Sequence, residues 1–304
     1  MKTGIGAMVL AAAGCLCAGA QQTPIFEFHS GFWVNLHQFL YSQAKDEKAP
    51  PAGSAAWQEA VGYYRREVAT HDHLDDDMAA LNNGLSRAER ADSLAGSGVE
   101  ARLAGVLEKA AGEYRKTWWP EHEAANRAWT AAVRPLLEKY GAAMKRDIAA
   151  AFRTEWPREP IRTEVAVKAS WAGAYTTNRP TLITISSTDP QNQGLASVEI
   201  LFHEASHSLD EKVNAALSQE LEAQKALFQR RAFGHAVLFY TAGEAARRNL
   251  GDYQPFGIKN GILERGWPGA LAVLEKDWKP YLEGTVPFAE AVRAVVRDYG
   301  VPKK

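Results

Sequence analysis

The chain has 304 residues, of which 46% are hydrophobic and 23% are charged. This globular composition excludes disordered, collagen-like and low-complexity proteins, and the length is sufficient for one large core or two smaller lobes. The 35 basic and 36 acidic residues leave a formal net charge of -1 with no block of like charge, so we expect no nucleic-acid partner.

Residues 1–20 have the pattern of a signal peptide. Lys2 precedes an apolar stretch, and Ala-Gly-Ala at 18–20 forms a small-x-small cleavage site before Gln21. The stretch is too short and too rich in Ala and Gly for a transmembrane anchor, and no later segment is apolar for long enough to span a bilayer. We therefore predict an exported protein, periplasmic or secreted, without a transmembrane span.

Both cysteines, Cys15 and Cys17, lie inside this leader. The mature chain would contain no cysteine, and so no disulfide and no thiol chemistry. The sequence Ala-Ala-Gly-Cys at 12–15 resembles a lipoprotein cleavage box with Ala in place of the usual Leu. Lipid attachment at Cys15 is therefore the less favoured alternative.

Residues 28–156 have the apolar periodicity of helices almost throughout. Two long helical patterns, at 99–116 and 121–152, occupy the second half of this stretch. Pro135 predicts a kink or a break within the second pattern. The pattern as a whole predicts a helical N-terminal lobe over residues 21–157.

The pattern changes after residue 157. Apolar and polar residues alternate over 161–168, which predicts a strand, and residues 181–186 predict a second one. Helical patterns then continue from residue 195 to the end. We expect a helix-dominated α+β fold with a small β-sheet, in which residues 158–304 form a second lobe.

An H-E-x-x-H motif lies in this second lobe, at residues 203–207. On a helix, His203 and His207 lie one turn apart on one face, which is the separation that two ligands of a tetrahedral zinc need. Glu204 is rotated by about 100° from His203, so it can reach a metal-bound water without being a ligand. A surface helix with two ordinary histidines is the simpler alternative, but it does not explain the glutamate between them.

These three residues resemble the motif of the zincin metallopeptidases. The resemblance extends to the predicted strand at 181–186, because in zincins a strand before the motif helix lies at the cleft edge and pairs with an extended peptide substrate. It implies a zincin-like fold, a bound Zn²⁺ and a peptide or protein substrate. It also implies that Glu204 is the general base that activates the attacking water.

A catalytic zinc usually has three protein ligands. The metzincin pattern requires a His or Asp six residues after His207, but this position is Val213. We therefore favour a gluzincin-like arrangement with Glu244 as the third ligand, because its small neighbours would let its helix pack closely. Glu220 and Glu222 are the rivals, in a stretch typical of a solvated helix. The sequence contains no Asn-Glu-x-x-Ser-Asp match to the thermolysin-like pattern.

Supporting groups surround these ligands in the sequence. Tyr240, one turn before Glu244, and His235, at the expected start of a helix, are candidates to stabilise an oxyanion. A buried aromatic and an ordinary histidine are the respective alternatives. Asp210 and Glu199 flank the motif and could accept hydrogen bonds from the ligand imidazoles.

Two other groups of charged residues invite interpretation. The run at 71–77 offers imidazoles and carboxylates that could bind a second cation, but we favour an acidic N-terminal helix turn, which the helix dipole stabilises. Arg247 and Arg248 are expected to pair with carboxylates or to lie exposed.

The favoured function is an exported zinc metallopeptidase. One alternative is a non-catalytic binding or scaffold protein that keeps a zincin fold, although a structural zinc site has no need for Glu204. The other alternative is a metallohydrolase that acts on a non-peptide amide or ester.

Overall fold

A computed structural model describes residues 23–46, 48, 53–169, 171–230 and 232–302 of the chain. The predicted signal peptide, together with Cys15 and Cys17, lies outside the described residues.

The first half of the chain is helical, as predicted, and its helices enclose an aromatic core that includes Trp33, Trp57 and Tyr114. Asp76 and Asp77 occupy the first turn of the third helix, as the helix-turn interpretation predicts. The structure also brings one ligand atom each from His71, Asp75 and Asp77 within 4.8 Å, as the second-cation alternative requires. The helices are α1 (Phe32–Lys45), α2 (Ala55–Tyr63) with a π-helical turn (Tyr64–Val68), α3 (Asp76–Arg87) and α4 (Ala101–Thr117).

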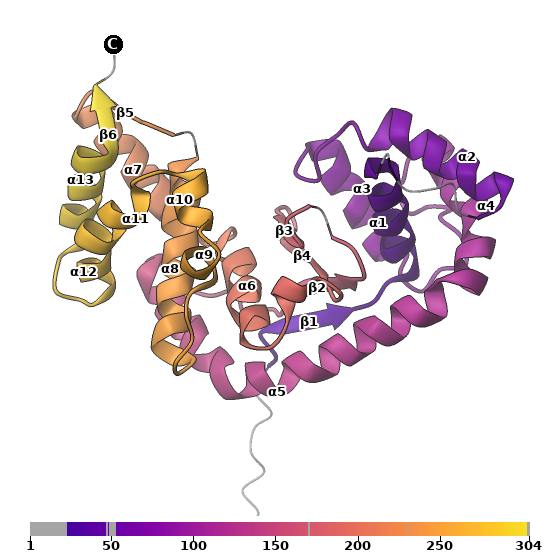
Figure 1. Cartoon of the computed structure of the whole chain (residues 1–304), viewed down its shortest axis with the longest axis horizontal. Helices are drawn as coiled ribbons and strands as arrows, with labels where there is room; N and C mark the ends of the chain where they lie inside the picture. The colour runs from indigo at the N-terminus through magenta and orange to yellow at the C-terminus, as the bar shows by residue number, and fades with distance from the viewer. Residues whose placement is uncertain (1–22, 47, 49–52, 170, 231, 303–304) are drawn as a thin grey trace, which may run out of the picture.

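Helix α5 (Trp119–Ala151) is the longest, with 33 residues, and Pro135 lies at its midpoint without ending it. Figure 1 shows the helix bending about half-way along, as the missing N–H of a proline allows. Its start packs on the aromatic core, whereas residues from Trp129 onward belong to a second core shared with the sheet and the later helices. The boundary between the two hydrophobic cores therefore lies within α5. The sequence suggested a lobe boundary later, near residue 157.

A small mixed sheet lies in this second core. Both predicted strands are present, but the one predicted at the cleft edge, β4, lies between β2 and β3. The edge is β3, a four-residue strand in a turn-rich stretch without visible alternation. The strands, in the order β1-β2-β4-β3, are β1 (Phe26–His29), β2 (Ile161–Ala166), β4 (Leu182–Ser186) and β3 (Ala174–Thr177). β1, β2 and β4 are parallel, and β3 is antiparallel to β4.

The rest of the chain is mainly helical, after a single 3₁₀ turn (Pro190–Asn192). The longer helices are α6 (Leu195–Ser206), α7 (Glu211–Ala223), α8 (Phe233–Asn249) and α13 (Phe288–Tyr299). The shorter elements are β5 (Ala226–Phe228), α9 (Phe256–Lys259), α10 (Ile262–Gly266), α11 (Ala270–Val273), a π-helical turn (Leu274–Trp278), α12 (Lys279–Leu282) and β6 (Gly300–Pro302).

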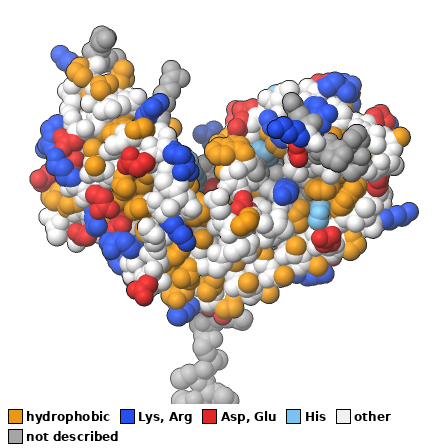
Figure 2. Space-filling view, viewed as in Figure 1, with side chains coloured by type: hydrophobic (Ala, Val, Ile, Leu, Met, Phe, Trp, Pro, Cys, Tyr) orange, Lys and Arg blue, Asp and Glu red, His pale blue; other side chains and the backbone are white. Residues whose placement is uncertain are grey.

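The predicted helix-dominated α+β fold with a small sheet is confirmed. In Figure 1, α1–α4 gather at one end of the molecule and α7–α13 at the other, while α5 runs beneath the sheet and α6. Figure 2 shows the surface hollowed between the two ends. Within the described part of the chain, no helix combines the length and the apolar character needed to cross a bilayer.

Candidate metal centre

The H-E-x-x-H motif forms the C-terminal end of α6, with His207 as the C-cap residue. This helix is buried at every position from Ser197 to Ser206, because α5, α8 and β3 pack around it. The polar stripe in its sequence is therefore not a solvated face. The rings of His203 and His207 lie one turn apart, with centroids separated by 5.2 Å, and only 4% of His203 is exposed.

A third histidine completes the cluster. His235 lies in the first turn of α8, and its Nε2 is 3.3 Å from Nε2 of His203. One ligand atom from each of His203, His207 and His235 falls within 4.8 Å of the others. Two nitrogens that bind one tetrahedral zinc at roughly 2.0–2.1 Å lie about 3.3–3.4 Å apart. The closest pair therefore has the separation of two ligands of the same ion.

The surroundings favour the neutral form of all three imidazoles. Burial, together with the neighbouring histidines, lowers the pKa of His203 well below its ordinary value and that of His207 to about 3. Burial also lowers the pKa of His235. Neutral imidazoles keep the lone pair that binds a metal, and three nitrogen donors suit zinc.

Glu204 follows His203 on α6, and its carboxyl group is held by the edge strand. It is 6% exposed, and the Thr176 hydroxyl of β3 lies 2.7 Å from its Oε2. Burial raises the pKa of Glu204 to about 7, although the hydrogen bond from Thr176 opposes the rise. A carboxyl group with a pKa near 7 can both accept and release a proton at neutral pH.

Thr176 also presents its backbone to the free edge of the sheet. The carbonyl of Gly173 accepts a hydrogen bond from the amide of Ser186, which fixes the alternation of the β3–β4 ladder. By this alternation, the backbone amide and carbonyl of Tyr175 form hydrogen bonds with β4. The backbone amides and carbonyls of Ala174 and Thr176 point away from β4, toward the free edge. The unpaired backbone groups therefore lie at the residue that contacts Glu204.

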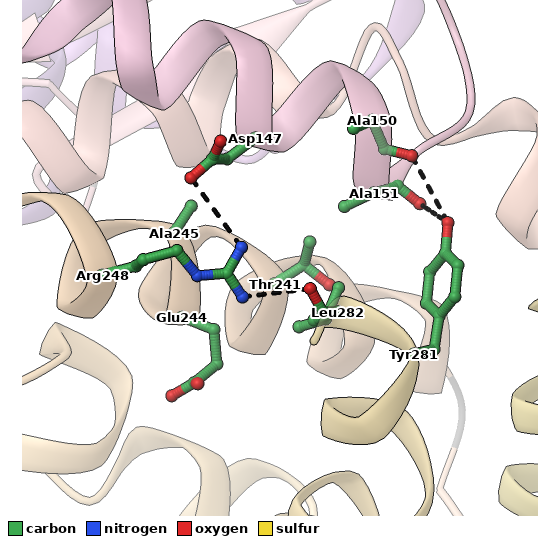
Figure 3. Close-up of a pocket in the computed structure, with 9 residues that line it drawn as sticks. All are labelled: Asp147, Ala150, Ala151, Thr241, Glu244, Ala245, Arg248, Tyr281 and Leu282. Atoms are coloured by element: carbon green, nitrogen blue, oxygen red, sulfur yellow. Dashed lines mark hydrogen bonds and ion pairs between the residues drawn. The ribbon is translucent and has the colours of Figure 1, made fainter. Parts of the chain in front are cut away.

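Glu244, the predicted third ligand, is not brought to the histidines. It follows His235 by nine residues on α8, which places it about 14 Å further along the helix and on the opposite side. Its buried carboxylate accepts two hydrogen bonds from Arg247, at 2.8 and 2.6 Å. Glu244 is among the residues that line a small cavity of about 130 Å³ between α5, α8 and α12. In Figure 3 its carboxylate points away from the Arg248 side chain, which approaches Asp147.

Tyr240 also lies away from the cluster. Five residues after His235, it is rotated by about 140° around α8. Its charged neighbours include Glu244, Glu275 and Arg247, so its hydroxyl belongs to the Glu244 side of the helix. Phe239, one turn after His235, takes the place beside the motif, with its ring centroid 4.1 Å from that of His203.

The remaining carboxylates have separate environments. Glu222 on α7 is exposed, and Glu220 on the same helix accepts a hydrogen bond from Gln224. Asp210 is half-buried and bonds to Asn214. Glu199 is fully buried, and its Oε2 accepts a hydrogen bond from the backbone amide of Phe256, at 2.8 Å.

Two features of the centre escaped the sequence analysis. Thr176 gave no signal, because the strand that carries it was not predicted. His235 was considered for the oxyanion and not as a ligand, although counting residues shows that His235 and Glu244 face opposite sides of one helix. Helical spacing therefore predicts that only one of His235 and Glu244 can lie next to the H-E-x-x-H motif.

Comparison of the chain with models of known protein families, with curated proteins and with solved structures gives no match in any of the three.

Proposed function

We propose that the chain is a zinc-dependent metallopeptidase with a zincin-like centre, in which His203, His207 and His235 hold the metal. The observation that carries the proposal is the grouping of three neutral imidazoles within 4.8 Å, with the buried Glu204 adjacent to His203 in the motif. His235 replaces Glu244 as the proposed third ligand, because the carboxylate of Glu244 faces Arg247.

The chain's own residues account for the proton movements of the reaction. Zinc, when bound, would supply a Lewis acid and an acidified water. Glu204 then accepts the proton of the attacking water at its carboxylate and donates it to the leaving amine nitrogen. The hydroxyl of Thr176 fixes the orientation of this carboxylate, 2.7 Å away.

The edge strand β3 supplies a place for an extended substrate. A peptide strand that adds to β3 can use the outward amide and carbonyl groups of Ala174 and Thr176. Because Thr176 also contacts Glu204, a peptide bond held opposite it lies close to the general base. This arrangement supports a peptide substrate over a small ester or amide.

Peptide turnover with metal analysis tests the proposal. The mature chain is loaded with zinc and incubated with a peptide library, with and without a chelator. We expect cleavage that chelation abolishes and zinc restores. Turnover of simple esters or amides without peptide cleavage would favour the metallohydrolase, and zinc binding without any turnover would favour a scaffold protein.

Substitution of the general base provides the matched control. Glu204→Gln is expected to retain zinc and to lose about 10²–10⁴-fold in kcat, because Gln cannot accept the proton. Metal content and turnover are measured on the same preparation. Near-normal hydrolysis by a zinc-loaded Glu204→Gln protein would refute the role of Glu204.

A further inference from the structure

A second cavity lies beside the start of the edge strand, on the face opposite to Glu204, because the side chains of Tyr175 and Thr176 point to opposite faces of the sheet. Its volume is about 530 Å³, and its walls come from α1, from the segment at 70–72 and from the connection between β2 and β3. Lys45 and Tyr41 line it on the α1 side, and Lys168 and Trp171 line it on the sheet side. The connection that supplies Lys168 and Trp171 leads directly into β3.

The floor of this cavity is bonded to the edge strand. Gln38 is 1% exposed, and its Nε2 donates a hydrogen bond to the hydroxyl of Tyr175, at 2.7 Å. Its Oε1 lies 3.2 Å from Nε2 of His73. Tyr175 immediately precedes Thr176, the residue that holds Glu204. The cavity and the metal centre are therefore attached to the same short strand.

The cavity carries two ammonium groups without a carboxylate partner. Among the residues that the structure describes, no Asp or Glu side chain forms an ion pair with Lys45 or Lys168. The one acidic residue in the lining, Asp72, accepts a hydrogen bond from the amide of Leu74 within its own turn. Trp171 is 92% exposed and offers an apolar surface at the rim. Two cations beside an aromatic surface suit a carboxylate next to an apolar group.

We infer that this cavity binds a carboxylate of the substrate on the C-terminal side of the scissile bond, an inference that rests on the proposed peptidase function. A peptide that adds antiparallel to β3, the more stable mode of pairing, runs from the metal centre toward the start of the strand. Five residues lead from Trp171 to Thr176, and because residues 171–173 form a turn, the separation is less than the roughly 17 Å of an extended chain. The carboxylate therefore lies within about five residues after the cleaved bond, as a free C-terminus or as an Asp or Glu side chain.

Peptide binding without turnover tests the inference. Three dansyl-labelled hexa-alanine peptides serve as probes: one ends in a free carboxylate, one in an amide, and one in an amide after a final Glu. Their dissociation constants are measured with the zinc-free full-length protein. We expect the free acid to bind about tenfold more tightly than the amide, as one charge-assisted contact provides. The Glu peptide shows whether a side-chain carboxylate is equivalent.

Lysine substitutions locate the effect. Lys168→Gln and Lys45→Gln should each remove most of the preference for the acid, whereas Lys109→Gln, which removes an exposed charge on α4, should keep it. Equal binding of the acid and the amide, no measurable binding of any probe, or a preference that survives both substitutions would overturn the subsite. A lysine-dependent preference in a protein that cleaves no peptide would contradict the proposed function and leave the subsite standing.

Discussion

Two buried glutamates on α6 have similar pKa values but different surroundings. Burial raises the pKa of Glu199 and of Glu204 to about 7. Glu204 accepts a hydrogen bond from the Thr176 hydroxyl on the edge strand, whereas Glu199 contacts the amide of Phe256 and the side chain of Tyr253. The position of each glutamate on the helix therefore decides its partners, and only Glu204 lies within the H-E-x-x-H motif.

Glu199 makes the stability of the fold depend on pH. Its pKa rises from 4.5 to about 7 on folding, so between these values the folded protein holds a proton that the unfolded chain releases. The free energy of unfolding is therefore expected to fall by up to about 3 kcal/mol as the pH rises from 4.5 through 7. Denaturant unfolding of the native protein and of Glu199→Gln across this range measures the difference. If the free energy of unfolding changed with pH equally in the two proteins, Glu199 would not be the source of the pH dependence.

The third ligand can be decided by two alanine substitutions. His235→Ala should lower zinc affinity by more than the roughly 10–100-fold that loss of a ligand's hydrogen-bond partner costs. Glu244→Ala should hold zinc like the parent and change stability by no more than about 1 kcal/mol, because the partly exposed Arg247 is solvated when it loses its partner. Zinc stoichiometry after mild chelation gives the result, with the exposed Glu222→Ala as the neutral control. Loss of zinc from Glu244→Ala alone would restore the assignment made from sequence.

At the scale of elements, the centre depends on how closely α6 and α8 approach. A Cβ at Gly243 would lie 3.0 Å from Cβ of Pro255 and 3.3 Å from Oε1 of Glu199, which is on α6. The contact runs along one face of α8, from Gly243 back to His235 at its start. The absence of a side chain at Gly243 thus lets α8 bring His235 to the motif.

Enlarging Gly243 should therefore disturb the metal site from a distance. Gly243→Ala is expected to cost about 1–3 kcal/mol of stability and to weaken zinc binding, because the crowded helices must separate. Gly105→Ala is the matched control, since nothing lies within 4 Å of its Cβ position on α4, and it should be neutral or stabilising by about 0.5–1 kcal/mol. Thermal unfolding and zinc titration of both variants give the comparison. Unchanged zinc affinity in Gly243→Ala would disprove this dependence.

The same elements show what the sequence could and could not predict. The motif helix and the strands β2 and β4 follow from periodicity over five or more residues. β3 did not, because four residues between turns give no period to detect. The small residues around Glu244 correctly indicated close packing, but the approach occurs at Gly243, and the side of α8 that faces the motif depends on tertiary contacts.

At the scale of the whole molecule, the sheet and the second core draw on both halves of the sequence. β1 pairs with β2 in a register that places Phe26 opposite Ile161. Trp129, Met144 and Ile148, from the second half of α5, pack in the core that contains α6. The core around the three histidines is therefore built from both halves of the chain.

Separate expression of residues 158–304 tests this interdependence. The fragment lacks β1 and the part of α5 that covers α6, so its core is exposed to solvent. We expect the fragment to lack a cooperative unfolding transition and to bind zinc poorly. Residues 23–304 should unfold cooperatively and bind zinc tightly. Circular dichroism and zinc titration of the two chains provide the measurement. A stably folded, zinc-binding fragment would show that the C-terminal half is autonomous.

The pairing of β1 with β2 also determines the order in which the chain can fold. β1 is among the first described residues to be synthesised, and its partner follows only after all of α1–α5. Contacts among α1–α4 are local and form early, whereas the sheet must close a loop of more than a hundred residues, which is slow because of its entropic cost. During synthesis, Phe26 and the apolar face of α5 remain exposed to solvent until β2 and the later helices have been made. Assembly of the three histidines, which depends on that core, is therefore a late event in folding.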